Sequence, residues 1–452
     1  MNRKSIIAGA VLGVCLVGAG GYFYTQYQAK AAFDRAIVQA RAKLGPNGTF
    51  IYRAAELEPF SHEGTLHDLL MKTPDGQIVT AHSLRVTTGW DGQLHSVSAD
   101  KVHVTKGVFS ADAGHMDIDG ISYSGELDMG PHAIDSMRFD KMTVASLSAT
   151  TPGGLIKTER VSFSNFGMGR RGDGIWQNID FIPADKQSFD HMHLAQFHFA
   201  GVGAFEAVKK LLYPETPSAQ AIGTQDLDMV DVAATRDGAQ MWSIAQATFH
   251  NDQGVPGQYH ITGQMRHFID KSNPATVQHM AAFGYDSMPF DGDFDMSYRT
   301  AGGVLDITSF VMKGKDAGTI SFAVKLEGVP AVTGNAAQAL PLLLQVKLAS
   351  ASLSFADGGF LQRAIDARAK ETGTSADAAR EALASELELR ASMSPPPFKD
   401  IQMAAATVVR HPGTLEIDVN PPAPVLLMQA ALEARINPVA LTSQLGLSAK
   451  AK

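Results

Sequence analysis

The sequence predicts a mainly β protein of extended or tandem antiparallel sheets, with an N-terminal transmembrane helix and a C-terminal α-rich subdomain. Three features predict this class. An uncharged apolar run lies near the start, apolar and polar residues then alternate with period two, and helical spacing returns towards the C-terminus. The 42 glycines and 21 prolines among 452 residues suit many short strands joined by turns.

The composition excludes several functional classes. Because the net charge is -8, no broad basic surface is available for phosphate contacts, and we expect no nucleic-acid partner. A hydrophobic share of 45% and a charged share of 19% are typical of a globular chain rather than a disordered one. The single cysteine excludes an internal disulfide and a cysteine-based zinc site.

Residues 1–30 are expected to form a cytoplasmic tip and a membrane anchor. The run 6–24 carries no charge, and at about 1.5 Å per residue it would span roughly 28 Å of bilayer as a helix. Arg3 and Lys4 precede this run and favour a cytoplasmic N-terminus. The rest of the chain is then expected to lie outside the cytoplasm.

Two alternatives to an uncleaved anchor stay open. Ala29, Lys30 and Ala31 have the small-x-small form of a signal-peptide cleavage site. Cys15 could carry a lipid, although the branched Val14 directly before it is poor for that processing. The length of the apolar run and the aromatic residues at its end favour the anchor.

A helical stalk is predicted over residues 31–48. Phe33, Ile37 and Leu44 recur at helical spacing, and a Gly-Pro-Asn-Gly sequence then ends the helix.

Two β-rich regions follow, 49–217 and 218–348, and the first includes a short helix at 204–213. Short apolar runs with period two predict strands in the first region at Ile78–Val86, Val102–Val104, Met116–Ile118, Met142–Val144 and Val161–Phe163. The second region is expected to form a meander through Phe290–Tyr298, Val304–Met312 and Thr319–Leu326.

A degenerate repeat runs through this β region. In each copy an acidic and a long polar residue precede two apolar residues that flank a polar one, and the acid is expected at the start of a strand. The copies begin at Asp100, Asp140, Glu159 and Asp190, with a looser fifth at Asp228. The apolar pairs should point inwards and form a candidate groove face of Val102, Val104, Met142, Val144, Val161, Phe163, Met192 and Leu194. Any antiparallel sheet would also produce such pairs.

The C-terminal region 349–452 is predicted to be α-rich with one or two strands. Helices are expected at Phe360–Lys370, from a capping box at Thr374 and Asp377 to about Arg390, at Pro424–Arg435 and at Val439–Leu445, with a strand at Leu415–Val419. Pro395, Pro396 and Pro397 should end the second helix.

No local motif indicates a cofactor-binding or metal-binding site. The glycine-rich sequence 167–172 matches a dinucleotide fingerprint, but a strand-like run follows it, so a hairpin loop is expected. His191, His193 and His198 suggest a metal site, yet Met192 and Leu194 should point inwards and leave these histidines in solvent.

Asp291, Asp293 and Asp295 alternate with other residues and lack the order of a calcium loop, so we expect a charged outer face. The chain contains no GxSxG, HExxH or P-loop sequence. We therefore expect no enzyme and assign no catalytic, cofactor-binding or metal-binding residue. A hydrolase whose active site is assembled from distant residues stays open as an alternative.

The anchor and the repeated strands resemble bacterial envelope proteins of the AsmA-like and YdgA-like kind. The resemblance rests on Arg3 to Tyr24 and on the repeat copies at Asp100, Asp140, Glu159 and Asp190. It implies an extended β-sheet whose apolar groove serves phospholipid movement or outer-membrane assembly. This chain departs from the family in its irregular repeat and its helical C-terminal region. The family brings no catalytic residues.

The expected function is that of a non-enzymatic, single-pass inner-membrane protein. Its β-rich body would lie in the periplasm and act as an envelope scaffold or a lipid-handling module, with phospholipid or another envelope protein as partner. If the inward faces instead pack on a second sheet, the protein is a sandwich-like interaction module that binds no lipid. An accessory subunit of a membrane complex is the remaining alternative.

Overall fold

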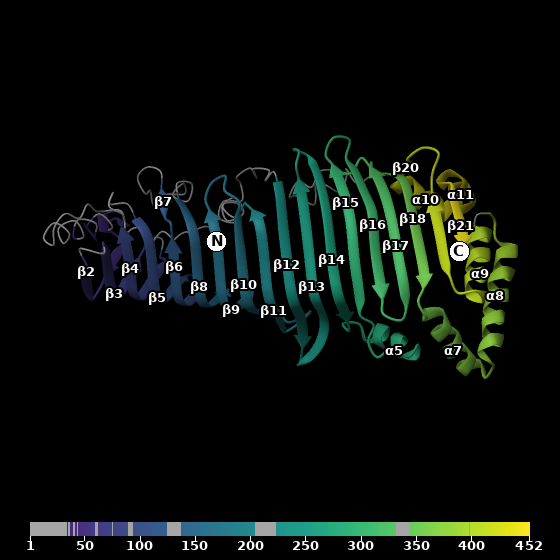
Figure 1. The fold of residues 1–452 in the computed structure, drawn as a ribbon, viewed down its shortest axis with the longest axis horizontal. Coiled ribbons are helices and arrows are strands. Elements are labelled where there is room, and N and C mark those ends of the chain that lie inside the picture. Colours follow the sequence, from purple (N-terminus) through teal and green to yellow (C-terminus); the bar gives the residue numbers. More distant parts are fainter. Residues whose placement is uncertain are drawn as a thin grey trace. The chain divides into compact units, whose positions relative to one another are not determined.

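The computed structural model shows a mainly β protein whose strands are antiparallel, with helices concentrated near the C-terminus (Figure 1). The structure describes residues 34, 37–38, 41–42, 44–58, 62–74, 76–88, 94–123, 137–203, 223–330, 344–396 and 398–452. The predicted anchor and the predicted helix at 204–213 lie outside these residues. No helix within the described ranges has the length and apolar character needed to cross a bilayer.

The chain divides into two compact units. Unit 1 comprises residues 1–221 and 225–240, and unit 2 comprises residues 222–224 and 241–452. The strands of unit 1 are β1 (Thr49–Ile51), β2 (Ala54–Glu58), β3 (Glu63–Lys72), β4 (Ile78–Thr88), β5 (Leu94–Lys106), β6 (Phe109–Asp119), β7 (Ser122–Tyr123), β8 (Met137–Thr151), β9 (Gly154–Phe166), β10 (Gly172–Pro183), β11 (His191–Val202) and β12 (Gly223–Arg236), whose first two residues belong to unit 2.

Unit 1 is a meander in which nearly every strand pairs with the next one along the chain. From β3 to β6 and from β8 to β12 the order in space follows the order in sequence, and β6 pairs with β8. The short β1 and β2 both pair with β3, and β7 pairs with β8. The strands are longer than predicted: β5 has 13 residues and β8 has 15, because their alternation continues through polar residues that the apolar pairs did not reveal.

The core of unit 1 lies on one face of this sheet. Leu66, Leu84, Val97 and Ile118 are fully buried in a single cluster that spans β3 to β9. The described residues between 34 and 44 are helical, and two of them, Ile37 and Leu44, belong to the same cluster. This helical segment therefore packs on the sheet instead of standing free.

Unit 2 combines a second antiparallel meander with a group of helices. Its strands are β13 (Ala239–Gln253), whose first two residues belong to unit 1, β14 (Gln258–Asp270), β15 (Phe290–Arg299), β16 (Val304–Gly314), β17 (Gly318–Glu327), β18 (Lys347–Asp357), β19 (Thr414–Val419), β20 (Val425–Leu426) and β21 (Leu447–Ala451). Its helices are α5 (Pro274–Ala282), α7 (Phe360–Thr372), α8 (Ala376–Met393), α9 (Phe398–Arg410), α10 (Leu427–Ile436) and α11 (Pro438–Leu445). Each strand from β13 to β18 pairs with the next, β21 pairs with β19, and β20 pairs with the start of β18.

The C-terminal helices begin and end at identifiable capping residues. The carboxylate of Asp357 accepts hydrogen bonds from the backbone of Gly359 and Leu361 and so caps α7, and Gly373 ends that helix in the left-handed conformation. Ser375, and not the predicted Thr374, caps α8 by accepting from the backbone N–H of Ala378.

The C-terminal region also differs from the prediction in its element content. Helix α9 was not predicted, although its first residue directly follows the three prolines. Four strands, β18 to β21, lie wholly or mainly in 349–452, where one or two were expected. Small side chains in β18 and the shortness of β20 and β21 weaken the period-two signal there.

Candidate apolar face and its polar counterpart

The eight predicted groove residues lie on the inward side of unit 1. Val102, Val104, Val144, Val161 and Leu194 are buried, and Met142, Phe163 and Met192 are half-buried. The strand register places Met142 opposite Phe163 and Val144 opposite Val161, so these four share one face. On β11, Met192 and Leu194 lie opposite Phe181 and Ile179 of β10.

The predicted position of the acids at strand starts is wrong for most copies. Asp190 directly precedes β11, but Asp100 lies in the middle of β5, Glu159 in the middle of β9, and Asp140 is the fourth residue of β8. The copies therefore lie at different heights in the sheet.

A separate feature crosses the sheet at one level. It is a row of nine residues, one on each strand from β3 to β12 except β7, which we call the kink row. Its members are Asp68, His82, Lys101, Gly114, Ser146, Glu159, Asn178, Ala195 and Asp231. On every second strand the member has a positive φ: Asp68, Lys101, Ser146, Asn178 and Asp231 have φ between 50° and 53°. On adjacent strands the two row members are not register partners, so the regular pairing of the strands is interrupted at this level.

The kink row shifts the alternation of side chains along each strand. In β5, Ala99 and Val102 are both buried although they are three residues apart, and regular strand geometry would put them on opposite faces. In β4 the same holds for Ala81 and Leu84. In β5 two successive polar residues, Asp100 and Lys101, lie at this break, and in β9 Glu159 and Arg160 do. In the copies at Asp140 and Asp190 the row members are Ser146 and Ala195, which follow the apolar pair, so the kink row does not account for the whole repeat.

Histidine and aspartate pairs cover the polar face of unit 1. His191 Nε2 and His193 Nδ1 lie 2.9 Å and 3.0 Å from the same carboxylate oxygen of Asp180. Burial raises the pKa of Asp180, but the hydrogen bonds from His193 and His191 outweigh this and hold it below the ordinary value. Among the described residues, no group of three or more His, Cys, Asp or Glu is arranged to hold a metal ion.

A second cluster on this face centres on His115. Its Nδ1 lies 2.6 Å from an Asp100 oxygen and its Nε2 lies 2.7 Å from Asp117, while Ser83 donates to the other Asp100 oxygen at 2.6 Å. The bond to Asp100 raises the pKa of His115, with a smaller contribution from Asp117, against the opposing effect of burial. Because both imidazole nitrogens face carboxylates and the serine hydroxyl bonds to Asp100, no hydroxyl is placed for activation by the imidazole.

Unit 2 carries an apolar face that runs without a charged residue across β14 to β18. The register aligns Phe294, Phe310, Phe322 and Leu353 in one row across four neighbouring strands. The remaining members of this face are Tyr259, Ile261, Gly263, Met265, Phe268, Phe290, Gly292, Met296, Tyr298, Leu305, Ile307, Met312, Ile320, Val324, Leu326, Leu348, Ala351 and Phe355. We call this set the unit 2 apolar face.

The unit 2 apolar face is only partly covered. Ile320 is 43% exposed and Leu353 is 45% exposed, whereas most inward residues of β3 to β9 in unit 1 are buried and the others are half-buried. The rings of Phe310 and Phe322 stack at 4.5 Å, so neighbouring side chains pack on one another along the sheet. The other face is polar: Asp293 pairs with Arg266 at 2.6 Å, and Asp295 lies 3.0 Å from His260 Nε2. The three aspartates of β15 thus lie on a charged outer face, as expected.

Sequence reasoning missed this face as a candidate site, although its signal was present. The period-two runs at Phe290–Tyr298, Val304–Met312 and Thr319–Leu326 were recognised as strands. They lack the polar doublet of the repeat, and so their apolar residues were not assigned to the groove.

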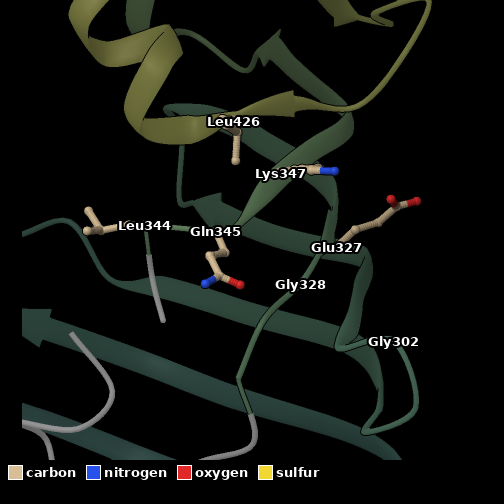
Figure 2. Close-up of a pocket in the computed structure, with 7 residues that line it drawn as sticks. All are labelled: Gly302, Glu327, Gly328, Leu344, Gln345, Lys347 and Leu426. Atoms are coloured by element: carbon tan, nitrogen blue, oxygen red, sulfur yellow. The ribbon is translucent and has the colours of Figure 1, made fainter. Parts of the chain in front are cut away.

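A hollow of about 500 Å³ lies at one end of the unit 2 strands (Figure 2). Its lining residues are Gly302, Glu327, Gly328, Leu344, Gln345, Lys347 and Leu426. Glu327 and Lys347 are register partners, and Figure 2 shows their charged ends directed to the same side. The lining holds one acid and one base, Glu327 and Lys347, and no serine, cysteine or histidine.

Comparison with known proteins covers only part of the chain. No curated protein and no solved structure matches it. A family model described only as "Uncharacterized protein" matches residues 311–452, which include β17 to β21 and the helices α7 to α11.

Proposed function

We propose that this protein is a non-enzymatic lipid-handling module held at a membrane by residues 6–24, with its β-rich body on the periplasmic side of an inner membrane. In this proposal acyl chains of phospholipid lie on the unit 2 apolar face. The single observation that carries it is the half-exposed, uncharged face of β14 to β18.

The chemistry of the unit 2 apolar face suits acyl chains. A methylene group gains about 0.8 kcal/mol when it leaves water for an apolar surface. Rows of Phe, Met, Leu and Ile side chains offer such a surface over five strands, and they offer no group that would need a polar partner apart from the two tyrosines. Tyr298 satisfies its hydroxyl by donating to the backbone oxygen of Val329.

Photocrosslinking in cells tests this proposal. In the full chain, Ile320 or Leu353 is replaced by p-benzoylphenylalanine, and the matched controls carry it at Ser321 or Ser354, which lie next in sequence but on the polar face. Cells grown with radioactive phosphate are irradiated, and the purified chain is tested for label. We expect label at positions 320 and 353 and none at 321 and 354.

Two outcomes would contradict the proposal. Absence of label at 320 and 353 would show that phospholipid does not occupy the face. Crosslinks from these positions to a second copy or to another protein, without label, would favour the scaffold function. The second copy would then complete a sandwich over the apolar face.

A further inference from the structure

Helix α10 exposes a stripe of large apolar side chains. Met428, Leu432 and Ile436 recur every four residues and are 55%, 58% and 73% exposed. Residues with this spacing lie on one side of a helix. Val439, at the start of α11, is also exposed. Contiguous apolar surface of this kind marks a site of interaction with a membrane or a protein.

The stripe is held in place by buried contacts behind it. Leu441 and Thr442 of α11 are buried, and α10 packs against α11. Asn437 caps α11 by accepting from the backbone N–H of Ala440, and Gly446 ends that helix in the left-handed conformation. Helix α10 is thus attached to the fold through α11 and β20, and the stripe lies on its exposed surface.

The stripe begins at the end of the unit 2 apolar face. Val425 of β20 lies opposite Leu348, a member of that face, and the backbone N–H of Leu427 donates to Val346 at 2.9 Å. These contacts join the start of α10 to the start of β18. A molecule that leaves the apolar face at this end of the strands would meet α10.

The charge of this segment favours an uncharged occupant. From Pro424 to Gly446 the sequence contains one acid, Glu433, and one base, Arg435, so its net charge is zero. Glu433 accepts a hydrogen bond from Gln429, one turn earlier on α10. The segment therefore has no net charge with which to attract a charged protein or an anionic surface, whereas a zwitterionic bilayer requires only apolar contact.

We infer that α10 lies in the surface of a phospholipid bilayer, with Met428, Leu432 and Ile436 in the acyl region. An interfacial helix of this kind buries its apolar side about 5–10 Å deep. The role of α10 at the end of a lipid path rests on the proposed function, but its insertion is a separate property. Such insertion would bring the end of the unit 2 apolar face to the membrane surface.

Depth-dependent quenching tests this inference on the full chain. Cys15 is replaced by alanine, Leu432→Cys is labelled with the fluorophore NBD, and the chain is reconstituted in phosphatidylcholine vesicles. The control is Ala431→Cys, an exposed residue of α10 about 100° from the centre of the stripe. Acceptor vesicles of phosphatidylcholine that carry doxyl-labelled lipid are then added.

We expect at least about twofold quenching of the label at 432, little quenching at 431, and the same result at about 0.1 M and 1 M salt, since the contact is apolar. Ile436→Cys should behave like Leu432→Cys. Equal quenching at 431 and 432, or none at 432 and 436, would overturn the inference. A blue shift that grows with protein concentration before acceptor vesicles are added would indicate self-association and would also overturn it.

The two proposals fail in different experiments. Phosphate label at position 320 without quenching at 432 would leave the lipid-binding face intact and remove the role of α10. Quenching at 432 without label at 320 would leave a membrane-docking helix on a protein whose sheet holds no phospholipid.

Discussion

His115 is held between two carboxylates, and this arrangement makes the polar face of unit 1 sensitive to pH. The pKa of His115 is raised by its bonds to Asp100 and Asp117, and the pKa of Asp100 is lowered by its bonds to Ser83 and His115. A group whose pKa is raised by folding stabilises the fold fully below its unfolded pKa, about 6.5 for histidine. That stabilisation is lost as the pH rises through the folded value.

Asp100→Asn should therefore destabilise the protein more at about pH 5.5 than at about pH 9, because the stabilisation by this pair falls as the rising pH removes the proton of His115. We expect the difference to be about 0.5–1 kcal/mol, because both side chains are about half exposed. Thermal unfolding followed by circular dichroism at the two pH values measures it. In a His115→Gln background the pH dependence of the effect should vanish, and an effect of equal size at both pH values in the natural background would contradict the prediction.

At the scale of a single strand, the five kink-row positions with positive φ require residues that tolerate a left-handed backbone. Lys101 has φ of 50°, and a β-branched side chain is strongly disfavoured there. Lys101→Val should cost about 1–2 kcal/mol, while Lys101→Gly should be close to neutral.

Thr105→Val is the matched control for this prediction, because Thr105 lies in the same strand and pairs regularly with Ile78 and Ser110. It should change stability little. Urea unfolding of the three variants provides the measurement. A loss at Thr105→Val as large as that at Lys101→Val would show that the kink row has no special backbone requirement.

Sequence patterns predicted individual strands and helices well where either strand alternation or helical spacing of apolar residues was uninterrupted. Leu415–Val419 was predicted as a strand and lies in β19, and Phe360–Lys370 was predicted as a helix and lies in α7. The kink row could not be predicted, because its residues are mostly ordinary polar ones and its effect appears only when nine strands are in register. Helix α9 was missed because the three prolines that directly precede it predict only the end of the helix before them.

At the scale of the whole molecule, the mainly β class with C-terminal helices was predicted correctly from alternation and turn residues. The candidate face was predicted only for unit 1. How far each apolar residue is covered depends on what packs over it, and a single strand does not encode that. The residues of unit 1 and unit 2 have the same alternation, yet Val104 is buried and Leu353 is exposed.

Membrane attachment is the prediction that belongs to the whole chain. If residues 6–24 form an anchor, Leu12→Arg together with Leu16→Arg should release the chain from the membrane fraction, since each central arginine costs about 2.5–3.5 kcal/mol. Gln26→Arg, beyond the run, should leave the chain membrane-bound. Cell fractionation with alkaline carbonate extraction distinguishes these results.

The mass of the mature protein provides the control for this experiment. An uncleaved anchor leaves the N-terminal residues in place, and intact mass spectrometry should find them. A mature chain that begins after Ala31 would contradict the anchor and show that the run is a signal peptide.

The kink row also limits how unit 1 can change length. In a regular strand, the loss of one residue exchanges the two faces. In unit 1 each of the nine strands already contains one break in this alternation, and the breaks lie side by side across the sheet. Deletion of Lys101 alone would therefore restore regular alternation of side chains in β5. It would also shift the register of one half of β5 by one residue relative to β4 and β6. We expect insertions and deletions to be tolerated in the turns of unit 1 and excluded from this line of nine residues.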